Sequence, residues 1–482
     1  MDYLTEINEA LSGVVWGAPM LVLLLGTGLY LSVRTGFLQI TRFGYMMRNT
    51  LGRIFKKQKA DDGSVTPFQA LTTALAATAG TGNIAGVTTA LTIGGPGAIF
   101  WMWVSGFIGM MTKYVEIVLA IRYRERNDKG EYVGGPMYYI KNGLGKGVNW
   151  LGVLFCLFGS LAALGVGNAV QVGNMTSSIK AALFHFAPGT AQLEDLIGLI
   201  IGLVTAVLVG LTLFGGFKRI GRVTEAVVPF AAVLYIVATL AVIFANMGEV
   251  GAAFGQIFRL AFAPQAALGG AAGVGAREAI RWGVRRGVFT NEAGLGSAPI
   301  AHAGTSEKSP VMQGLYGICE VFIDTIVMCT LTALTLLVSG IALPYGTTGT
   351  VDLNIAAFAT VLGMDASSLL LCASMTLFAL ATVLGWALYG MRCFEYIFGT
   401  GRLKLYQAVY VLVTVLGATT DLEMIWSVGD TLNGLMAVPN LIALLLLSGV
   451  AVEITKKHFR HTDLREPKMG KAKGKERPLR LR

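Results

Sequence analysis

The stretch Ala79-Gly80-Thr81-Gly82-Asn83 interrupts an otherwise apolar run over residues 68–91. Two glycines and an asparagine weaken a helix in its middle, where a membrane-spanning helix should be most regular. Within a bilayer, an interrupted backbone is tolerated only where it lines protein or a water-filled cavity. The peptide groups that this interruption leaves free are therefore expected to bind a ligand, and residues 79–83 are called the first break below.

A second interruption, Ala293-Gly294-Leu295-Gly296-Ser297, repeats the glycine spacing and also ends in a small polar residue. Corresponding interrupted helices in two halves of a chain indicate a transporter binding site. The alternative is a pair of glycine-rich helix contacts, because the chain holds 62 glycines and small residues favour close helix packing. Residues 293–297 are called the second break.

The composition indicates a membrane protein. The 482 residues are 54% hydrophobic and only 14% charged, with a mean hydropathy of +0.63, so charged side chains are too few to cover a soluble protein of this size. The apolar runs are long enough for helical spans, whereas the alternation expected of an outer-membrane barrel is absent. The predicted fold class is an all-α polytopic membrane protein.

Eleven transmembrane helices are expected. The runs cover residues 13–33, 68–92, 97–121, 148–184, 196–215, 223–246, 277–303, 310–340, 366–398, 404–418 and 423–452. Lys and Arg concentrate in alternate connections, beginning with Arg34 and Arg42, which predicts an N-terminus outside and a C-terminus in the cytoplasm. The first run is followed rather than preceded by basic residues, so we expect no cleavable signal peptide.

The chain divides into two halves of five helices, each opening with an interrupted helix. An odd number of spans per half means that the second repeat enters the membrane from the opposite face, which is an inverted-topology arrangement. The predicted units are an extra helix with a basic cytoplasmic loop (1–62), a first repeat (63–246), a second, inverted repeat (247–455) and a basic cytoplasmic tail (456–482). We expect the tail to bind anionic lipid, with solvated disorder as the alternative.

The net charge of +10 does not indicate nucleic acid, because the basic residues lie in connections and in the tail rather than along one stripe. The five cysteines all lie within apolar runs and form no CxxC pair, so neither a disulfide framework nor a metal site is expected from them. The four histidines show no metal-ligand spacing, and no P-loop is present, which argues against an enzyme and an ATP-driven pump.

An interrupted helix exposes N–H groups at the start of its second half and carbonyl groups at the end of its first half. An amino acid zwitterion matches this pattern: its carboxylate would meet the amides of Thr81, Gly82 and Asn83, and its ammonium and a small cation would meet carbonyls of 76–79 and 289–291. No acidic residue occurs over 68–91, which favours sodium over a titrating carboxylate.

Polar side chains on other runs are further candidates. Asn168 and Gln171 could reach the same cavity, or could join helices by hydrogen bonds. Thr382 and Trp386 lie four residues apart on one face, so the hydroxyl could complete a cation site and the indole could limit a small pocket, with ordinary packing as the alternative for the tryptophan. Asp324 is a candidate member of a cation path.

Charged residues inside the runs need partners. The spacings of Lys113 with Glu116, of Glu320 with Asp324 and of Arg392 with Glu395 allow same-face pairs. Four arginines precede the second break, and they either pair with Glu278, Glu292 or lipid headgroups, or shape an outer entrance and its field. These are Arg277, Arg281, Arg285 and Arg286.

Three motifs resemble the alanine or glycine:cation symporter family: residues 80–86 (GTGNIAG), 134–139 (GGPMYY) and 289–298 (FTNEAGLGSA). The resemblance extends from the first helix to the last. It implies a LeuT-type inverted repeat and sodium-coupled uptake of alanine, glycine or their D-forms across the cell membrane of a bacterium or archaeon. It also implies that residues 78–83, Gln171, 289–291, and Thr382 with Trp386 surround substrate and sodium.

The predicted function is a sodium-coupled symporter that imports small neutral amino acids by alternating access. A proton-coupled transporter is the alternative, and a channel is a weaker one because no filter-like loop is present. Na⁺ is the expected co-transported ion, with no prosthetic group and no nucleic-acid partner. The expected substrate contacts are Thr78, Gly80, Thr81, Gly82, Asn83, Gln171, Phe289, Thr290, Asn291 and Trp386, and the expected sodium ligands are Ala76, Thr78, Ala79, Asn83, Thr290 and Thr382.

Overall fold

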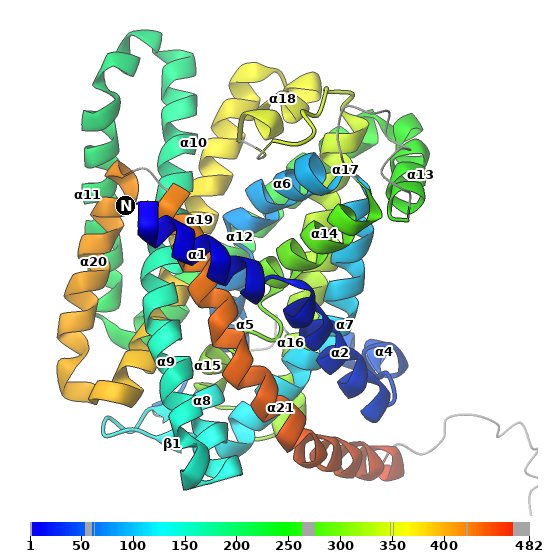
Figure 1. Cartoon of the computed structure of the whole chain (residues 1–482), viewed down its shortest axis with the longest axis vertical. Coiled ribbons are helices and arrows are strands. Elements are labelled where there is room, and N and C mark those ends of the chain that lie inside the picture. The colour runs from blue at the N-terminus through cyan, green and yellow to red at the C-terminus, as the bar shows by residue number, and fades with distance from the viewer. Residues whose placement is uncertain are drawn as a thin grey trace, which may run out of the picture.

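The computed structural model describes residues 2–53, 60–61, 63–262, 275–347, 349, 351–420 and 423–465, and Figure 1 shows that helices make up nearly all of it. Among these residues, eight helices are long and apolar enough to cross a membrane. The two interrupted helices and the 17-residue helix α20 bring the spans into agreement with the eleven that were expected. The predicted all-α polytopic fold is confirmed.

The first repeat runs from α5 to α12. Its elements are α5 (Pro67–Thr78), η2 (Thr81–Asn83), α6 (Ala85–Gly94), α7 (Gly97–Tyr123), α9 (Asn149–Leu164), the π-helix η5 (Gly165–Ala169), α10 (Val170–Phe186), α11 (Glu194–Leu213) and α12 (Gly216–Ala245). Helix α5 begins where the sequence favours a start, because Thr66 and Gln69 form a reciprocal capping box around Pro67.

The second repeat runs from α14 to α21. Its elements are α14 (Ala276–Asn291), α15 (Ala298–Ala303), α16 (Pro310–Val321), the π-helix η9 (Phe322–Cys329), α17 (Thr330–Val338), α19 (Met364–Phe398), α20 (Leu403–Thr419) and α21 (Glu423–Arg465). Its helices pack mainly on helices of the first repeat: α14 and α16 on α7, α19 on α9 and α10, and α20 on α11. The two repeats therefore share one core and place both breaks inside it.

Short elements cover the two ends of the bundle (Figure 1). One end carries the strands β1 (Glu125–Arg126) and β2 (Tyr132–Val133) and the helices α8 (Pro136–Tyr139), α3 (Leu38–Thr41) and α4 (Phe43–Asn49). It also carries the π-helix η3 (Ile140–Leu144) and the 3-10 helices η1 (Leu51–Arg53), η4 (Lys146–Val148) and η10 (Thr400–Arg402). The other carries α13 (Val250–Leu260), α18 (Val351–Leu362), η6 (Pro188–Leu193) and η7 (Met247–Glu249), where the sequence had indicated loops alone.

The first expected span, 13–33, is wrong at its start. The structure has two helices, α1 (Asp2–Val15) and α2 (Ala18–Arg34), separated at Trp16 and Gly17. Helix α1 crosses in front of α21 in Figure 1, and the buried indole of Trp16 donates a 3.1 Å hydrogen bond to the carbonyl of Asp430. Tertiary contacts of this tryptophan thus divide an apolar run that hydropathy alone reads as continuous.

The end of the last span also differs. Helix α21 continues past residue 452 to Arg465, so the first part of the expected basic tail is helical. Residues 466–482 of that tail, and residues 54–59 of the expected basic loop, lie outside the described residues. The proposed binding of anionic lipid by the tail stays a prediction.

Candidate functional site

The two breaks share a glycine spacing but not a conformation. At the second break, Glu292 ends α14 in the left-handed region (φ 55), and Gly294 (φ 92) and Gly296 (φ 82) follow in conformations that favour glycine. At the first break, Gly80 has an ordinary φ of −109, and a Cβ there would lie 2.5 Å from the hydroxyl oxygen of Thr382. The glycines of the first break are therefore needed for close approach rather than for backbone freedom.

The first break leaves hydrogen-bond donors free. Among the described residues, no backbone acceptor is found for the N–H groups of Thr81 and Gly82, whereas those of Asn83 and Ile84 close short turns onto Gly80 and Thr81. Two adjacent amides at the start of a helical segment form a binding site for an anion such as a carboxylate.

The second repeat faces these amides. A Cβ on Gly82 would lie 3.2 Å from the methyl carbon of Thr290 and 3.5 Å from the ring of Phe289. The predicted residues 82, 289 and 290 therefore come together, although 207 positions separate Gly82 from Phe289 in the chain. The end of α14 and the first break form opposite sides of one small region.

Gln171 lies at the first break as expected. Its side-chain oxygen accepts a 2.8 Å hydrogen bond from the hydroxyl of Thr81, and its amide donates to the carbonyl of Val166. Asn174 donates to the same hydroxyl at 3.0 Å. The sequence analysis missed Asn174, although its position three residues after Gln171 places it on the same helix face.

A group of oxygen atoms lies on the carbonyl side of the first break. The hydroxyl of Thr382 is 2.8 Å from the carbonyl oxygen of Ala76 and 2.9 Å from that of Phe378. Ala76, Ala79 and Thr382 are buried, with at most 1% of each exposed. Thr78 differs from this group because its hydroxyl points back to the carbonyl of Ala74 at 3.2 Å, within its own helix. Carbonyl and hydroxyl oxygens are the ligands that hard cations prefer.

Asn83 directs its side chain toward the other repeat. Its amide nitrogen donates a 2.8 Å hydrogen bond to the carboxylate of Asp324 and a 3.1 Å hydrogen bond to the backbone carbonyl of the same residue. The side-chain oxygen of Asn83 is buried and has no hydrogen-bond partner among the described residues. The absence of acidic residues in the first interrupted helix had favoured a site without a carboxylate. The segment 68–91 itself has no acidic residue, but η9 brings the carboxylate of Asp324 to Asn83 from a distant part of the chain.

Asp324 belongs to a larger polar cluster. The hydroxyl of Thr325 donates a 2.9 Å hydrogen bond to the second carboxylate oxygen of Asp324. The same hydroxyl accepts a 3.1 Å hydrogen bond from the side-chain amide of Asn291. The oxygen of Asn291 accepts from the backbone N–H of Ala293 at the second break. Asn83 and Asn291 thus contact Asp324 and Thr325, and Thr290 lies near them through Cys329, whose sulfur is 3.9 Å from the Thr290 hydroxyl. The side-chain oxygens in this cluster could hold a second cation.

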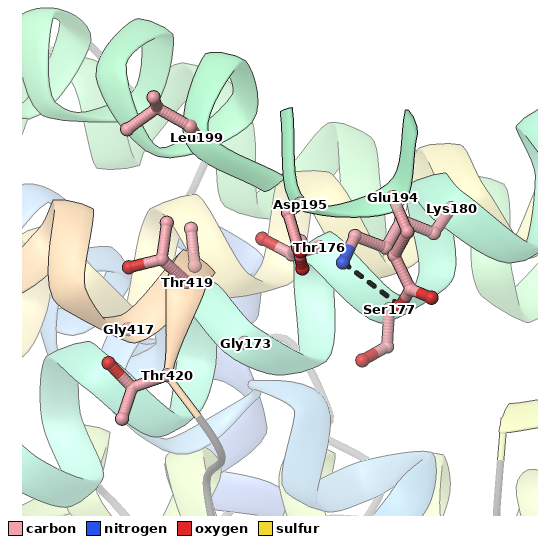
Figure 2. Close-up of a pocket in the computed structure, with 11 residues that line it drawn as sticks. Gly173, Thr176, Ser177, Lys180, Glu194, Asp195, Leu199, Gly417, Thr419 and Thr420 are labelled. Carbon is pink, nitrogen blue, oxygen red and sulfur yellow. Dashed lines mark hydrogen bonds and ion pairs between the residues drawn. The ribbon is translucent and has the colours of Figure 1, made fainter. Parts of the chain in front are cut away.

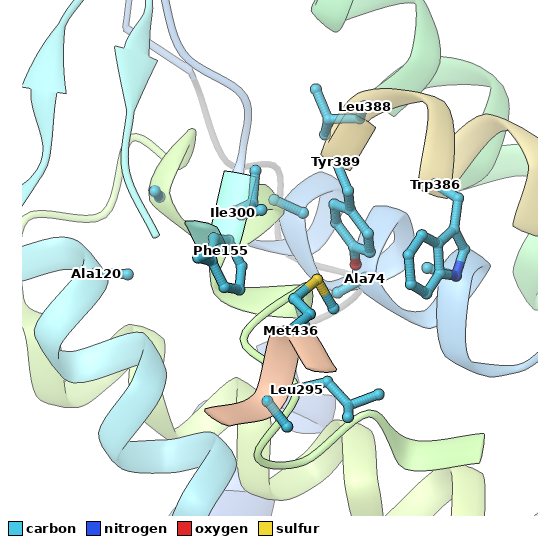
Figure 3. Close-up of a cluster of buried hydrophobic side chains, with 14 of the residues drawn as sticks. Ala74, Ala120, Phe155, Leu295, Ile300, Trp386, Leu388, Tyr389 and Met436 are labelled. Carbon is cyan, nitrogen blue, oxygen red and sulfur yellow. The ribbon is translucent and has the colours of Figure 1, made fainter. Parts of the chain in front are cut away.

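Trp386 lies in packed surroundings. Its ring meets that of Tyr389 edge-on at 5.6 Å, and a Cβ on Gly167 would lie 2.4 Å from it. Figure 3 shows it among buried apolar side chains of both repeats, including Ala74 and Met436. With 2% of its surface exposed, Trp386 fills space between α19 and η5, and its role in limiting substrate size stays a prediction.

The second break is held by residues that the sequence analysis did not assign to it. The carboxylate of Glu116 accepts a 3.1 Å hydrogen bond from the backbone N–H of Gly294 and a 2.6 Å hydrogen bond from the side-chain amide of Asn440. The same amide donates a 2.9 Å hydrogen bond to the carbonyl of Gly294. Tyr139, within the motif at 134–139, donates to Asn440. Sequence spacing cannot reveal such a link, because its members lie on four separate elements.

Several expected charge pairs are different in the structure. Lys113 pairs with Glu320 at 3.1 Å rather than with Glu116, and Glu320 also contacts His302 at 3.0 Å. Arg392 and Glu395 do pair, at 2.6 Å. Asn168 joins helices through Tyr410 and Thr414, and Glu292 accepts a hydrogen bond from Ser297. Of the four arginines before the second break, Arg281 lies 3.9 Å from Glu278 and Arg285 pairs with Asp430.

A pocket of about 650 Å³ lies elsewhere, between α10, α11 and the end of α20 (Figure 2). Lys180 and Glu194 on its wall already form an ion pair at 3.1 Å. The residues that line this pocket include none from either break, so the pocket lies apart from the substrate site expected at the centre of the bundle.

Comparison with known proteins identifies the family of the chain. The sodium:alanine symporter family model matches residues 1–472. The chain is 46% identical over 459 residues to the sodium/alanine symporter AgcS of Methanococcus maripaludis, covering 95% of this chain and 97% of that protein. It is 36% identical over 460 residues to the probable sodium/glutamine symporter GlnT of Bacillus subtilis, covering 94% and 91% of the two chains.

A solved structure supports the fold assignment. The crystal structure of MhsT in complex with L-phenylalanine has a TM-score of 0.57 with this chain at 13% identity, covering 82% of this chain and 99% of that one. Such a likeness shows the fold alone, which is the LeuT-type arrangement that the family resemblance implied. The chain belongs to the sodium:alanine symporter family, and it is a sodium-coupled amino-acid symporter rather than an enzyme.

Proposed function

We propose that the protein imports a small neutral amino acid, alanine or glycine or D-alanine, together with sodium. The observation that carries this proposal is the first break, where the free amides of Thr81 and Gly82 lie beside Phe289 and Thr290. Backbone amides bind the carboxylate that all amino acids share, and the close approach of Phe289 leaves little room for a side chain. The name of the relative AgcS supports the same substrate.

The proposed sodium ligands divide into two groups. Ala76, Ala79 and Thr382 would hold one ion on the carbonyl side of the first break, where the Thr382 hydroxyl is 2.8 Å from the carbonyl of Ala76. Asn83 and Thr290, together with Asp324, would hold a second ion, because the Asn83 oxygen is buried without a donor and Asp324 supplies a negative charge. Transport would follow by alternating access, as the repeats rock around these sites.

The proposed orientation is N-terminus outside and C-terminus in the cytoplasm, in the cell membrane. Basic connections that include Arg34 and Arg126 would then face the cytoplasm, in accordance with the positive-inside rule.

Uptake of labelled alanine into proteoliposomes tests the proposal. Accumulation should require an inward sodium gradient and should be inhibited by glycine and by D-alanine at similar concentrations. Equal uptake with and without the gradient would contradict sodium coupling, and sodium-driven uptake that favours a large amino acid over alanine would contradict the proposed substrate.

A proton-coupled mechanism is the second candidate, and Asp324 is the observation that favours it. A buried carboxylate beside a proposed ion site can carry a proton instead of facing a metal ion. The same liposomes with a pH gradient in sodium-free buffer distinguish the two mechanisms. We expect no accumulation under that condition.

A further inference from the structure

A groove lies where the two N-terminal helices meet the interrupted helix of the second repeat. Its volume is about 770 Å³, and its wall is formed by residues between 13 and 21, at the junction of α1 and α2, and by residues 277, 280 and 281 of α14. Helix α2 packs on α7 and also contacts α14, and both N-terminal helices are drawn in dark blue in Figure 1. The residues that line the groove include none from either break, so it is separate from the candidate substrate and sodium sites.

The length of α2 places the groove at the edge of the bilayer. Its 17 residues span about 25 Å at the usual rise per residue, which is close to the thickness of the hydrocarbon core. The groove lies at the start of α2, and Arg34 ends this helix at the opposite side. Val14 and Val22, near the junction, are 71% and 69% exposed, as expected for apolar side chains that contact lipid. A lipid can therefore enter the groove with its headgroup at the membrane surface.

Two arginines supply the charge of this groove. Among the described residues, Arg277 and Arg281 are the only charged side chains on its wall. Arg277 is exposed and forms no ion pair in that part of the chain, whereas Arg281 lies 3.9 Å from the partly exposed carboxylate of Glu278. An ion pair at this distance and exposure is weak. Two guanidinium groups and one carboxylate leave one positive charge uncompensated beside an apolar wall.

The inner wall of the groove is held in place by the rest of the bundle. The indole of Trp16, which is buried, donates a 3.1 Å hydrogen bond to the carbonyl of Asp430 on α21, and the guanidinium of Arg285 on α14 lies 5.6 Å from the centre of the Trp16 ring. Gly13 leaves the groove open, because a Cβ there would meet no atom within 4 Å. The groove is therefore formed without a ligand, and its volume is within the range of pockets that bind small molecules.

We propose that this groove binds an anionic phospholipid, with an acyl chain along the junction of α1 and α2 and the phosphate group on Arg277 and Arg281. The planar guanidinium can donate two parallel hydrogen bonds to phosphate oxygens. An anionic headgroup neutralises the uncompensated charge, whereas a zwitterionic headgroup brings a cation of its own. The proposed site does not depend on the identity of the transported amino acid or of the coupling ion.

Photolabelling in lipid nanodiscs tests the site. The probe is phosphatidylglycerol with a diazirine on one acyl chain, and the labelled peptides are identified by mass spectrometry. We expect label within residues 13–21 of the wild-type protein. Dioleoylphosphatidylglycerol should compete with the probe, dioleoylphosphatidylcholine should compete at least about tenfold less well, and inorganic phosphate should not compete because it lacks the chain.

Two variants separate the charge from the apolar wall. The double change Arg277→Gln/Arg281→Gln should raise the probe concentration for half-maximal labelling by about ten- to thirtyfold, as expected for two basic side chains that act on an anionic lipid. Lys456→Gln/Arg460→Gln removes the same charge from exposed positions of α21 outside the groove and should leave the labelling of residues 13–21 unchanged.

The second variant, Gly13→Leu, places a side chain in the open space and should reduce labelling while both arginines remain. Gly251→Leu is its matched control, because Gly251 is also an exposed helical glycine whose Cβ position meets no atom within 4 Å. Both variants should elute from size-exclusion chromatography as the wild type does, which separates loss of the site from loss of the fold.

The effect of the lipid on stability gives a second measurement. A lipid in the groove contacts α1, α2 and α14 together, so phosphatidylglycerol added to the protein in a neutral detergent should raise its melting temperature. The rise should be smaller in Arg277→Gln/Arg281→Gln and in Gly13→Leu than in the wild type.

Four results would overturn the inference. These are no label within residues 13–21, equal competition by phosphatidylcholine, equal competition by inorganic phosphate, and unchanged half-maximal labelling in the double arginine variant. Equal competition by phosphatidylcholine would mean that the groove takes up acyl chains without recognising the headgroup. Equal competition by phosphate would assign the arginines to a free anion instead.

Discussion

The side-chain amide of Asn83 donates a 2.8 Å hydrogen bond to the carboxylate of Asp324, which connects the first break to the π-helix η9. The two residues are separated by 241 positions and come from different repeats. No ion pair of Asp324 is found within the described part of the chain, so this buried carboxylate needs a proton or a metal ion for charge balance. The pair therefore couples the backbone of the first break to a site that can respond to a cation.

Asp324→Asn should weaken the apparent affinity for sodium by about ten- to a hundredfold, because it removes the negative charge while keeping the shape of the side chain. Asn83→Ala should weaken it in the same direction through loss of the free oxygen. Alanine uptake as a function of sodium concentration measures both effects. Glu453→Gln, at a carboxylate that is 64% exposed and paired with Lys457, is the control. Unchanged sodium dependence in both test variants would remove this cluster from the proposed ion sites.

Thr382→Val should also weaken the apparent sodium affinity, since valine keeps the branched shape and lacks the hydroxyl that lies 2.8 Å from the carbonyl of Ala76. Ser374→Ala on the same helix is a matched control, because that buried hydroxyl has no hydrogen-bond partner in the described structure. The two variants should fold equally well in size-exclusion chromatography. If they show the same sodium dependence, the Thr382 hydroxyl serves only to join α19 to α5.

The sequence predicted the fold well because the determinants of the fold are local. Charge, hydropathy and paired glycine stretches indicate spans, repeats and breaks within one segment at a time. Where a single side chain makes distant contacts, the prediction failed: Trp16 divides the first run by bonding to Asp430, which no window around residue 16 reveals.

Site residues were predictable only in part, for the same reason. Thr81 and Gln171 were found because both lie in unusual local sequence, and they form a hydrogen bond of 2.8 Å. The carboxylate of Asp324 at Asn83, and that of Glu116 at Gly294, depend on how helices from both repeats pack. Composition near a break therefore cannot exclude a carboxylate from it.

The end of the bundle that carries β1 and β2 should lose stability at acid pH. Burial raises the pKa of Glu131, but the charge and hydrogen bond of Arg392 outweigh it and the pKa is lowered. Because the pKa of Glu131 is lower in the folded protein than in the unfolded chain, ionised Glu131 stabilises the fold at pH values above the unfolded pKa, near 4.5. This stabilisation is lost as the pH falls through the pKa of the folded state.

Thermal unfolding in detergent at a series of acid pH values checks this link. Glu131→Gln should lower the melting temperature at neutral pH and should flatten its decline toward acid pH, because Arg392 then retains only Glu395 at 2.6 Å. Glu249→Gln, at an exposed carboxylate, should follow the wild-type curve. A variant curve parallel to that of the wild type would mean that other carboxylates dominate acid unfolding.

Trp386 should set the upper limit of substrate size. Backbone amides of the first break bind a carboxylate without regard to the side chain, so discrimination has to come from the volume that remains. Trp386→Leu should let valine and leucine inhibit alanine uptake, and should weaken alanine itself by about 1 to 3 kcal/mol through lost contacts. Trp150→Leu is the control, since Trp150 is 60% exposed.

Gly167→Ala offers a second and opposite change at this position. A methyl group on Gly167 would lie 2.4 Å from both Cβ and Cγ of Trp386, and because Cβ is fixed to α19, either the helix or the ring has to shift. If the displaced ring enters the substrate region, Gly167→Ala should exclude alanine before it excludes glycine, whereas Trp386→Leu should admit larger substrates. Inhibition of uptake by glycine, alanine, valine and leucine in both variants measures the two shifts. A cutoff that stays the same in both would show that Trp386 only packs against Gly167 and Tyr389, and that another side chain limits the pocket.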